Sequence, residues 1–206
     1  MVNKYLYLFN YGSHKLLPHS DIIYKLSRHI PFGKISEEFK MNSIICTSPS
    51  KTFNLAGLQL SNIIIPNIRI RQQLNNKLRT IDIDPNSFAS VAQIAAYNQG
   101  EEWLEQLLVY LQNNLDFIDK FVKERLQRVR LIKPEATYLA WLDFSDYGLT
   151  DNELRELMQK KAKVAMDDGY IFGSGGEKHQ RINFACPRST LEKALESIEK
   201  SLKGIK

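Results

Sequence analysis

The segment Ser48–Asn67, "SPSKTFNLAGLQLSNIIIPN", places a single lysine between small polar residues and an apolar run. Lys51 follows two serines and a proline and precedes Phe53. A lysine in such surroundings can act, when neutral, as a nucleophile, a Schiff-base former or a general base. It can equally extend its amine to solvent from the end of a strand. The residues around Lys51 leave both interpretations open.

Short apolar runs on either side of Lys51 predict strands. Residues 43–46 ("SIIC") and 61–65 ("SNIII") are apolar and are bounded by turn-forming residues. Such runs are consistent with strands that are buried on both faces, as in the parallel or mixed sheets of α/β proteins. The sequence around Lys51 therefore indicates an α/β fold.

Helical periodicity follows these runs. Residues 66–81 carry apolar side chains at helical spacing, and the Asp84–Pro85 pair interrupts the pattern, so a new helix is predicted near Asn86. From Glu101 onward, a long apolar stripe with charged residues opposite predicts an extended amphipathic helix. A helix of this length often joins two lobes.

The rest of the chain predicts an α+β lobe. Residues 137–144 ("TYLAWLDF") alternate as a half-buried strand does. Thr150 with Glu153, and Ser189 with Glu192, have the spacing of capping boxes, which predicts two further helix starts. The order strand, helix, short strands and helix fits such a lobe.

The overall composition excludes several classes of protein. The 206 residues are 43% hydrophobic and 25% charged, as in a globular protein. The net charge of +5 comes from basic and acidic residues that are interleaved, so we expect no nucleic-acid surface. Cys46 and Cys186 lack metal-ligand or disulfide spacing, and histidines such as His14 and His19 do not cluster with partners, so we expect no metal. The first residues are too briefly apolar for a membrane span or a signal peptide, and the cytoplasm is the default.

Arg181 and Asp21 are ambiguous as isolated residues. Arg181 lies in a strand-like run, "RINFAC", after a glycine-rich turn. Arginine binds carboxylates through two parallel hydrogen bonds, but a strand arginine also commonly forms a surface ion pair. Asp21 and Tyr24, in "SDIIYK", by themselves indicate an ordinary turn.

Taken together, several separated segments resemble one family. The Ser48–Asn67 segment is similar to the Schiff-base lysine region of pyridoxal-phosphate enzymes of the aminotransferase class I/II superfamily (fold type I). The branch of cystathionine β-lyases and cysteine-S-conjugate β-lyases is the most similar. The resemblance continues in order through "HIPFGKISEEF", "AAYNQGEEWLEQLLVYLQNN", "PEATYLAWLDF" and "RINFACPRSTLEKALE".

This resemblance implies roles for individual residues. Lys51 would hold the cofactor aldehyde and would later act as the general base at the substrate Cα. Asp21 would pair with the pyridine nitrogen and keep it protonated, and Tyr24 would hydrogen-bond the ring hydroxyl. These are the assignments for the ring.

The resemblance also assigns the phosphate and the substrate. Ser48 and, less directly, Ser50 would contact the cofactor phosphate. Arg181 would hold the substrate α-carboxylate and so fix the Cα–H bond over the lysine.

The same resemblance implies an architecture. We expect the C-terminal part of a fold-type-I enzyme, with a remnant of the large α/β domain over residues 1–99. A long linking helix and a small α+β C-terminal domain would occupy residues 100–206. The family pattern implies that the chain begins inside the large domain and lacks the segments that normally precede this point. Because those segments would cover residues 43–46 and 61–65, we expect these two runs to expose apolar surface. The full-length family pattern implies a homodimer.

The implied activity is β-elimination from an L-cysteine thioether such as cystathionine, which gives a thiol, pyruvate and ammonia. An aminotransferase is the alternative, because both mechanisms begin in the same way. Gln59, where many transaminases carry arginine, favours the lyase. A catalytically silent fragment that acts as an interaction lobe is the third possibility.

Overall fold

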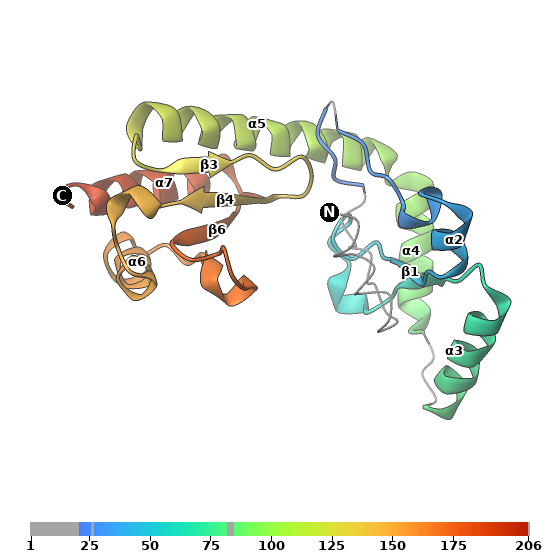
Figure 1. The fold of residues 1–206 in the computed structure, drawn as a ribbon. Helices are drawn as coiled ribbons and strands as arrows, with labels where there is room; N and C mark the ends of the chain where they lie inside the picture. Colours follow the sequence, from blue (N-terminus) through green and yellow to red (C-terminus); the bar gives the residue numbers. More distant parts are fainter. Residues whose placement is uncertain (1–20, 26, 82–84, 206) are drawn as a thin grey trace. The chain divides into compact units, whose positions relative to one another are not determined.

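The structure is a computed structural model that describes residues 21–25, 27–81 and 85–205 (Figure 1). The helices are α2 (Glu37–Met41), α3 (Ile68–Thr80), α4 (Ser87–Gln99), α5 (Glu101–Arg125), α6 (Asp151–Glu156) and α7 (Arg188–Leu202). The strands are β1 (Ile45–Thr47), β2 (Asn62–Ile64), β3 (Arg130–Ile132), β4 (Leu139–Asp143), β5 (Asp167–Asp168) and β6 (His179–Asn183). Shorter helical turns are η1 (Phe32–Lys34), η2 (Ala56–Leu58), η3 (Ser145–Tyr147), η4 (Leu157–Ala162) and η5 (Gly169–Phe172).

The chain divides into two compact units, Met1–Gln106 and Leu107–Lys206. In the sequence, the boundary falls inside the long helix α5. Among the described residues, no helix combines the length and apolar composition needed to cross a membrane.

The first unit contains a two-stranded antiparallel sheet. Ile45 of β1 lies opposite Ile64 of β2, and Thr47 lies opposite Asn62. In the described part of the chain these strands pair with each other alone, and Ile64 is 51% exposed. The prediction of strands buried on both faces, typical of a parallel or mixed sheet, is therefore wrong for this unit. The expected exposure of apolar surface is confirmed for residues 61–65, at Ile63 and Ile64, but not for residues 43–46, which are buried or half-buried.

Two helices of the first unit, α3 and α4, begin at asparagine caps. The Asn67 side chain accepts a hydrogen bond from Arg69 N at 3.0 Å at the start of α3. Asn86 accepts one from Phe88 N at 2.9 Å at the start of α4. Each cap satisfies a backbone donor that the first turn leaves unpaired. The predicted helix start near Asn86 is confirmed, while Asp84 lies outside the described residues.

The second unit is built on a four-stranded antiparallel sheet in the order β3-β4-β6-β5, and Figure 1 shows it with α5, α6 and α7. The predicted strand is β4, and its buried face carries Ala140 and Leu142. The predicted stripe on α5 is also buried over its second half. The core side chains from these helices are Leu111, Leu115, Ile118, Phe121 and Val122 of α5, Leu154 of α6, and Leu191, Leu195, Ile198 and Leu202 of α7.

One of the two predicted capping boxes forms. The Thr150 side chain accepts from Glu153 N while Glu153 Oε2 accepts from Thr150 N at 2.8 Å. The box at Ser189 is wrong, because α7 begins at Arg188 with Pro187 as its N-cap. The Pro187 carbonyl accepts the first backbone bonds of the helix, so Ser189 already lies inside the first turn and cannot cap it.

Candidate active site

Lys51 lies in a tight turn between β1 and η2. The Pro49 carbonyl accepts from Phe53 N at 2.9 Å, and the Ser50 carbonyl accepts from Leu55 N at 3.1 Å. These bonds fix the backbone on both sides of Lys51, whose side chain is exposed. The turn therefore presents a primary amine from an ordered backbone.

Asp21 accepts a hydrogen bond from Thr52, the residue that follows Lys51. The Thr52 hydroxyl donates to Asp21 Oδ2 at 2.7 Å, across 31 positions of sequence. Thr52 itself is fully buried. The hydrogen bond brings a carboxylate beside the Lys51 turn, and so joins two residues that the sequence singled out separately.

A chain of polar side chains continues from Asp21 to α4. Partial burial raises the pKa of the Tyr97 phenol, the negative charge of Asp21 raises it further, and a hydrogen bond with Thr47 lowers it. Asn62 Nδ2 donates to Thr47 Oγ1 at 3.3 Å, and Gln93 Nε2 donates to Asn62 Oδ1 at 2.7 Å. Residues of β1, β2 and α4 thus form one polar network, and its Tyr97 approaches the Asp21 carboxylate.

Tyr24, three positions after Asp21, is 6% exposed. Burial raises the pKa of its phenol well above the ordinary value, because the charged phenolate is poorly solvated there. Tyr24 is therefore a neutral hydroxyl at any physiological pH.

The two serines before Lys51 form one hydrogen-bonded unit. Ser48 Oγ donates to the Leu60 carbonyl at 2.7 Å. Its oxygen also accepts from Ser50 N at 3.1 Å and lies 2.6 Å from Ser50 Oγ. Because Ser48 has one hydroxyl proton and gives it to Leu60, the proton between the two hydroxyls must come from Ser50.

Phe53 packs against the junction of α4 and α5. Its ring centroid lies 6.1 Å from that of Tyr97 and 5.7 Å from that of Trp103. Gly100 lies under the ring, and a Cβ at this position would be 2.4 Å from Phe53 Cε1 and 2.4 Å from the Ala96 carbonyl. Only glycine permits this close approach.

We expect Gly100→Ala to destabilise the first unit by about 2 kcal/mol, because the added methyl group must displace the Phe53 ring. Gly57→Ala is the matched control, since a Cβ at Gly57 meets no atom within 4 Å. The control should stay within about 0.5 kcal/mol of the original chain. The unfolding free energies of both variants are measured by urea unfolding, which is followed by Trp103 fluorescence in a Trp141→Phe background. Equal midpoints for the two variants would contradict the packing argument.

Arg181 belongs to β6 of the second unit. Its Nε and Nη2 donate to Asp167 Oδ2 at 3.1 and 2.7 Å, and its guanidinium lies 4.3 Å from the Phe172 ring centroid. The Phe172 ring also packs against Trp141 at 5.3 Å. The guanidinium is therefore already paired with a carboxylate, which is the surface ion pair that the sequence left open.

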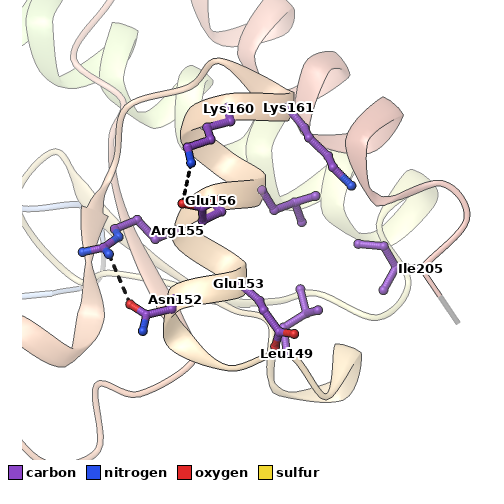
Figure 2. A pocket seen from close by; sticks show the side chains of 9 residues that line it. Leu149, Asn152, Glu153, Arg155, Glu156, Lys160, Lys161 and Ile205 are labelled. Carbon is purple, nitrogen blue, oxygen red and sulfur yellow. Dashed lines mark hydrogen bonds and ion pairs between the residues drawn. The ribbon is translucent and has the colours of Figure 1, made fainter.

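A separate hollow of about 740 Å³ lies beside α6 and η4 (Figure 2). Its charged groups are largely paired with neighbours on the same helix. Lys160 Nζ donates to Glu156 Oε1 at 2.6 Å, and Arg155 Nη2 donates to Asn152 Oδ1 at 3.2 Å. None of the predicted site residues lines it. Among the described residues, no group of His, Cys, Asp and Glu side chains could hold a metal, and His14 and His19 lie outside the described residues.

The chain is similar to a known protein family over most of its length. The sequence model of the family "Aminotransferase class I and II" matches residues 12–198. The chain belongs to the class I and II aminotransferase family. Its relatives include cystathionine beta-lyase PatB of Bacillus subtilis (strain 168), which is 42% identical over 89% of this chain. Protein MalY of Escherichia coli (strain K12) is 33% identical over 91% of this chain.

Solved structures of this aminotransferase family have the same fold. A PLP-bound putative aminotransferase from Clostridium difficile 630 is 48% identical, with a TM-score of 0.88 over 90% of this chain. Cystalysin from Treponema denticola, which contains pyridoxal 5'-phosphate, is 33% identical, with a TM-score of 0.88 over 92% of this chain. The chain spans 48% of the length of each of these four relatives.

Two residues of the Lys51 region, Thr52 and Tyr97, were not predicted from the sequence. Thr52 carried a signal, because it directly follows the lysine in the family segment. Tyr97 lies in another segment that resembles the aminotransferase family, "AAYNQG", but its spacing contains no sign that it approaches Asp21. Long-range contacts of this kind depend on the folded chain.

Proposed function

We propose that this chain is part of a pyridoxal-phosphate-dependent C–S β-lyase. The observation that carries the proposal is the hydrogen bond between Thr52 and Asp21. It supports the proposal because Asp21, whose carboxylate suits a pyridine nitrogen, is hydrogen-bonded to the residue that follows Lys51, whose amine suits an aldehyde. The names of the relatives, cystathionine beta-lyase among them, support the choice of reaction.

The side chains around the Lys51 turn fit this cofactor chemically. The Lys51 amine would take the aldehyde, Asp21 the ring nitrogen, and the neutral Tyr24 phenol the ring hydroxyl. When bound, pyridoxal phosphate would supply an electron sink for the charge left at the substrate Cα.

For the phosphate, the hydrogen bonds favour Ser50 over Ser48. The Ser48 proton is held by the Leu60 carbonyl, whereas Ser50 donates to another hydroxyl and could turn its proton to an anion at small cost. We therefore propose that Ser50 donates to the phosphate and that Ser48 mainly fixes the loop.

Once the substrate amine has released it from the aldehyde, the Lys51 amine would remove the proton from the Cα atom of the amino-acid thioether. Arg181 would hold the α-carboxylate, for which the substrate must replace Asp167 on the guanidinium. Loss of the Cα proton and departure of the β-sulfur as a thiol leave a product that water converts to pyruvate and ammonia.

An aminotransferase is the second candidate, since similar solved structures and curated relatives carry that name. The test is to incubate the chain with pyridoxal phosphate and L-cystathionine, and in parallel with an amino acid and a keto acid. A lyase releases pyruvate and homocysteine, whereas an aminotransferase forms a new amino acid. A chain that binds the cofactor and forms neither product would support the third possibility, a silent interaction lobe.

We further propose that the active assembly is a homodimer in the cytoplasm, and that residues 1–99 and 100–206 are its large-domain and small-domain parts. Gel filtration with light scattering would test the assembly, and a monomer that turns over substrate would overturn it.

A further inference from the structure

We infer that Thr52 is a positioning residue that orients the Asp21 carboxylate for the ring nitrogen of the cofactor. This inference rests on the proposed function. It adds a residue that does not contact the cofactor itself but acts on it by orienting Asp21. Its basis is the contact between Thr52 Oγ1 and Asp21 Oδ2 at 2.7 Å.

The location of Thr52 suits this role. Its side chain is fully buried, so water cannot replace the carboxylate as partner of the hydroxyl. A buried hydroxyl without a partner is costly, and a bond to a carboxylate is stronger than one between neutral groups. The contact therefore resists breaking and holds one oxygen of Asp21 in place.

The backbone at Thr52 is also held. Its neighbours in the turn form the bonds from Phe53 N to Pro49 and from Leu55 N to Ser50. Because Lys51 and Thr52 share this turn, the hydroxyl sets the carboxylate relative to the backbone that carries the amine. An electrostatic partner that is already oriented before the cofactor binds does not have to be reorganised, so it stabilises the cofactor more.

The test uses two cofactors that differ in the ring atom concerned. Pyridoxal phosphate has a ring nitrogen, whereas 1-deazapyridoxal phosphate has a carbon there and cannot pair with Asp21. Equilibrium dialysis of the full chain gives the dissociation constant for each. The ratio of the two constants reports on the pairing and cancels any general loss of the fold.

Thr52→Val keeps the shape of the side chain and removes its hydroxyl. It should raise the dissociation constant of pyridoxal phosphate about tenfold. Binding of the deaza compound should change by less than about twofold. In an Asp21→Asn background, Thr52→Val should not change the ratio further. Thr52→Ser should keep the ratio of the original chain, and this arm remains informative if the valine variant does not fold.

The possible failures are distinct. The positioning role is wrong if Thr52→Val weakens the binding of both compounds equally. It is also wrong if Thr52→Ser has the same ratio of dissociation constants as Asp21→Asn. In either case the binding of the cofactor itself still stands. If the original chain binds neither compound, the proposed function is wrong and this inference falls with it.

Discussion

Lys51→Ala should abolish the covalent attachment of pyridoxal phosphate to this chain. The original chain, incubated with the cofactor and reduced with borohydride, should carry one added pyridoxyl phosphate group on the peptide that contains Lys51. Alanine removes the only atom of this residue that can bond the aldehyde, so the label should be lost and not merely reduced. Peptide mass spectrometry and the visible absorption of the unreduced mixture measure the result.

Lys77→Ala is the control for this experiment. Lys77 is an exposed lysine of α3 in the same unit, so non-specific reaction with surface amines would affect it as readily as Lys51. The control should retain the full label on Lys51. Label that is spread over several lysines, or retained in Lys51→Ala, would remove Lys51 from the site.

Asn114→Ala should destabilise the second unit by about 3 kcal/mol. Asn114 is 1% exposed, and its Nδ2 donates to the carbonyls of Phe184 at 2.9 Å and Cys186 at 3.0 Å. Its Oδ1 accepts from Arg188 Nε at 2.9 Å. Alanine leaves these buried polar groups without the side chain that satisfies them. Urea unfolding followed by Trp141 fluorescence, in a Trp103→Phe background, measures the loss.

Asn113→Ala is the matched control for Asn114. Asn113 is the preceding residue of α5, and its side chain is exposed. Its carbonyl, which accepts from Arg188 Nη2, is kept by alanine. The control should change the unfolding free energy by less than about 0.5 kcal/mol. A similar loss in both variants would mean that helix propensity, and not the hydrogen bonds, governs this position.

The elements with strong local signals could be predicted from the sequence. The Asn86 cap, the apolar stripe of α5, the alternation in β4 and the Thr150 capping box depend on residues a few positions apart. Local geometry decides such features, so their signals survive in the sequence. The Ser189 box failed because Pro187 offered an earlier start for the same helix.

The pairing of β1 with β2 could not be predicted from the two apolar runs. An apolar run indicates a strand but not its partner, and these strands form an antiparallel pair that leaves Ile64 exposed. Strand partners are chosen by contacts between distant residues, which a local pattern does not contain.

By itself the sequence determined the candidate residues of the site, because lysine, aspartate and tyrosine have chemistries that their surroundings modify but do not create. The tertiary structure alone decided which of them meet. The Thr52–Asp21 bond spans 31 positions, Tyr97 approaches Asp21 from α4, and Asp167 pairs with Arg181. Hydrogen bonds and charges act over a few ångströms of space, and only the folded chain brings such distant residues within that range.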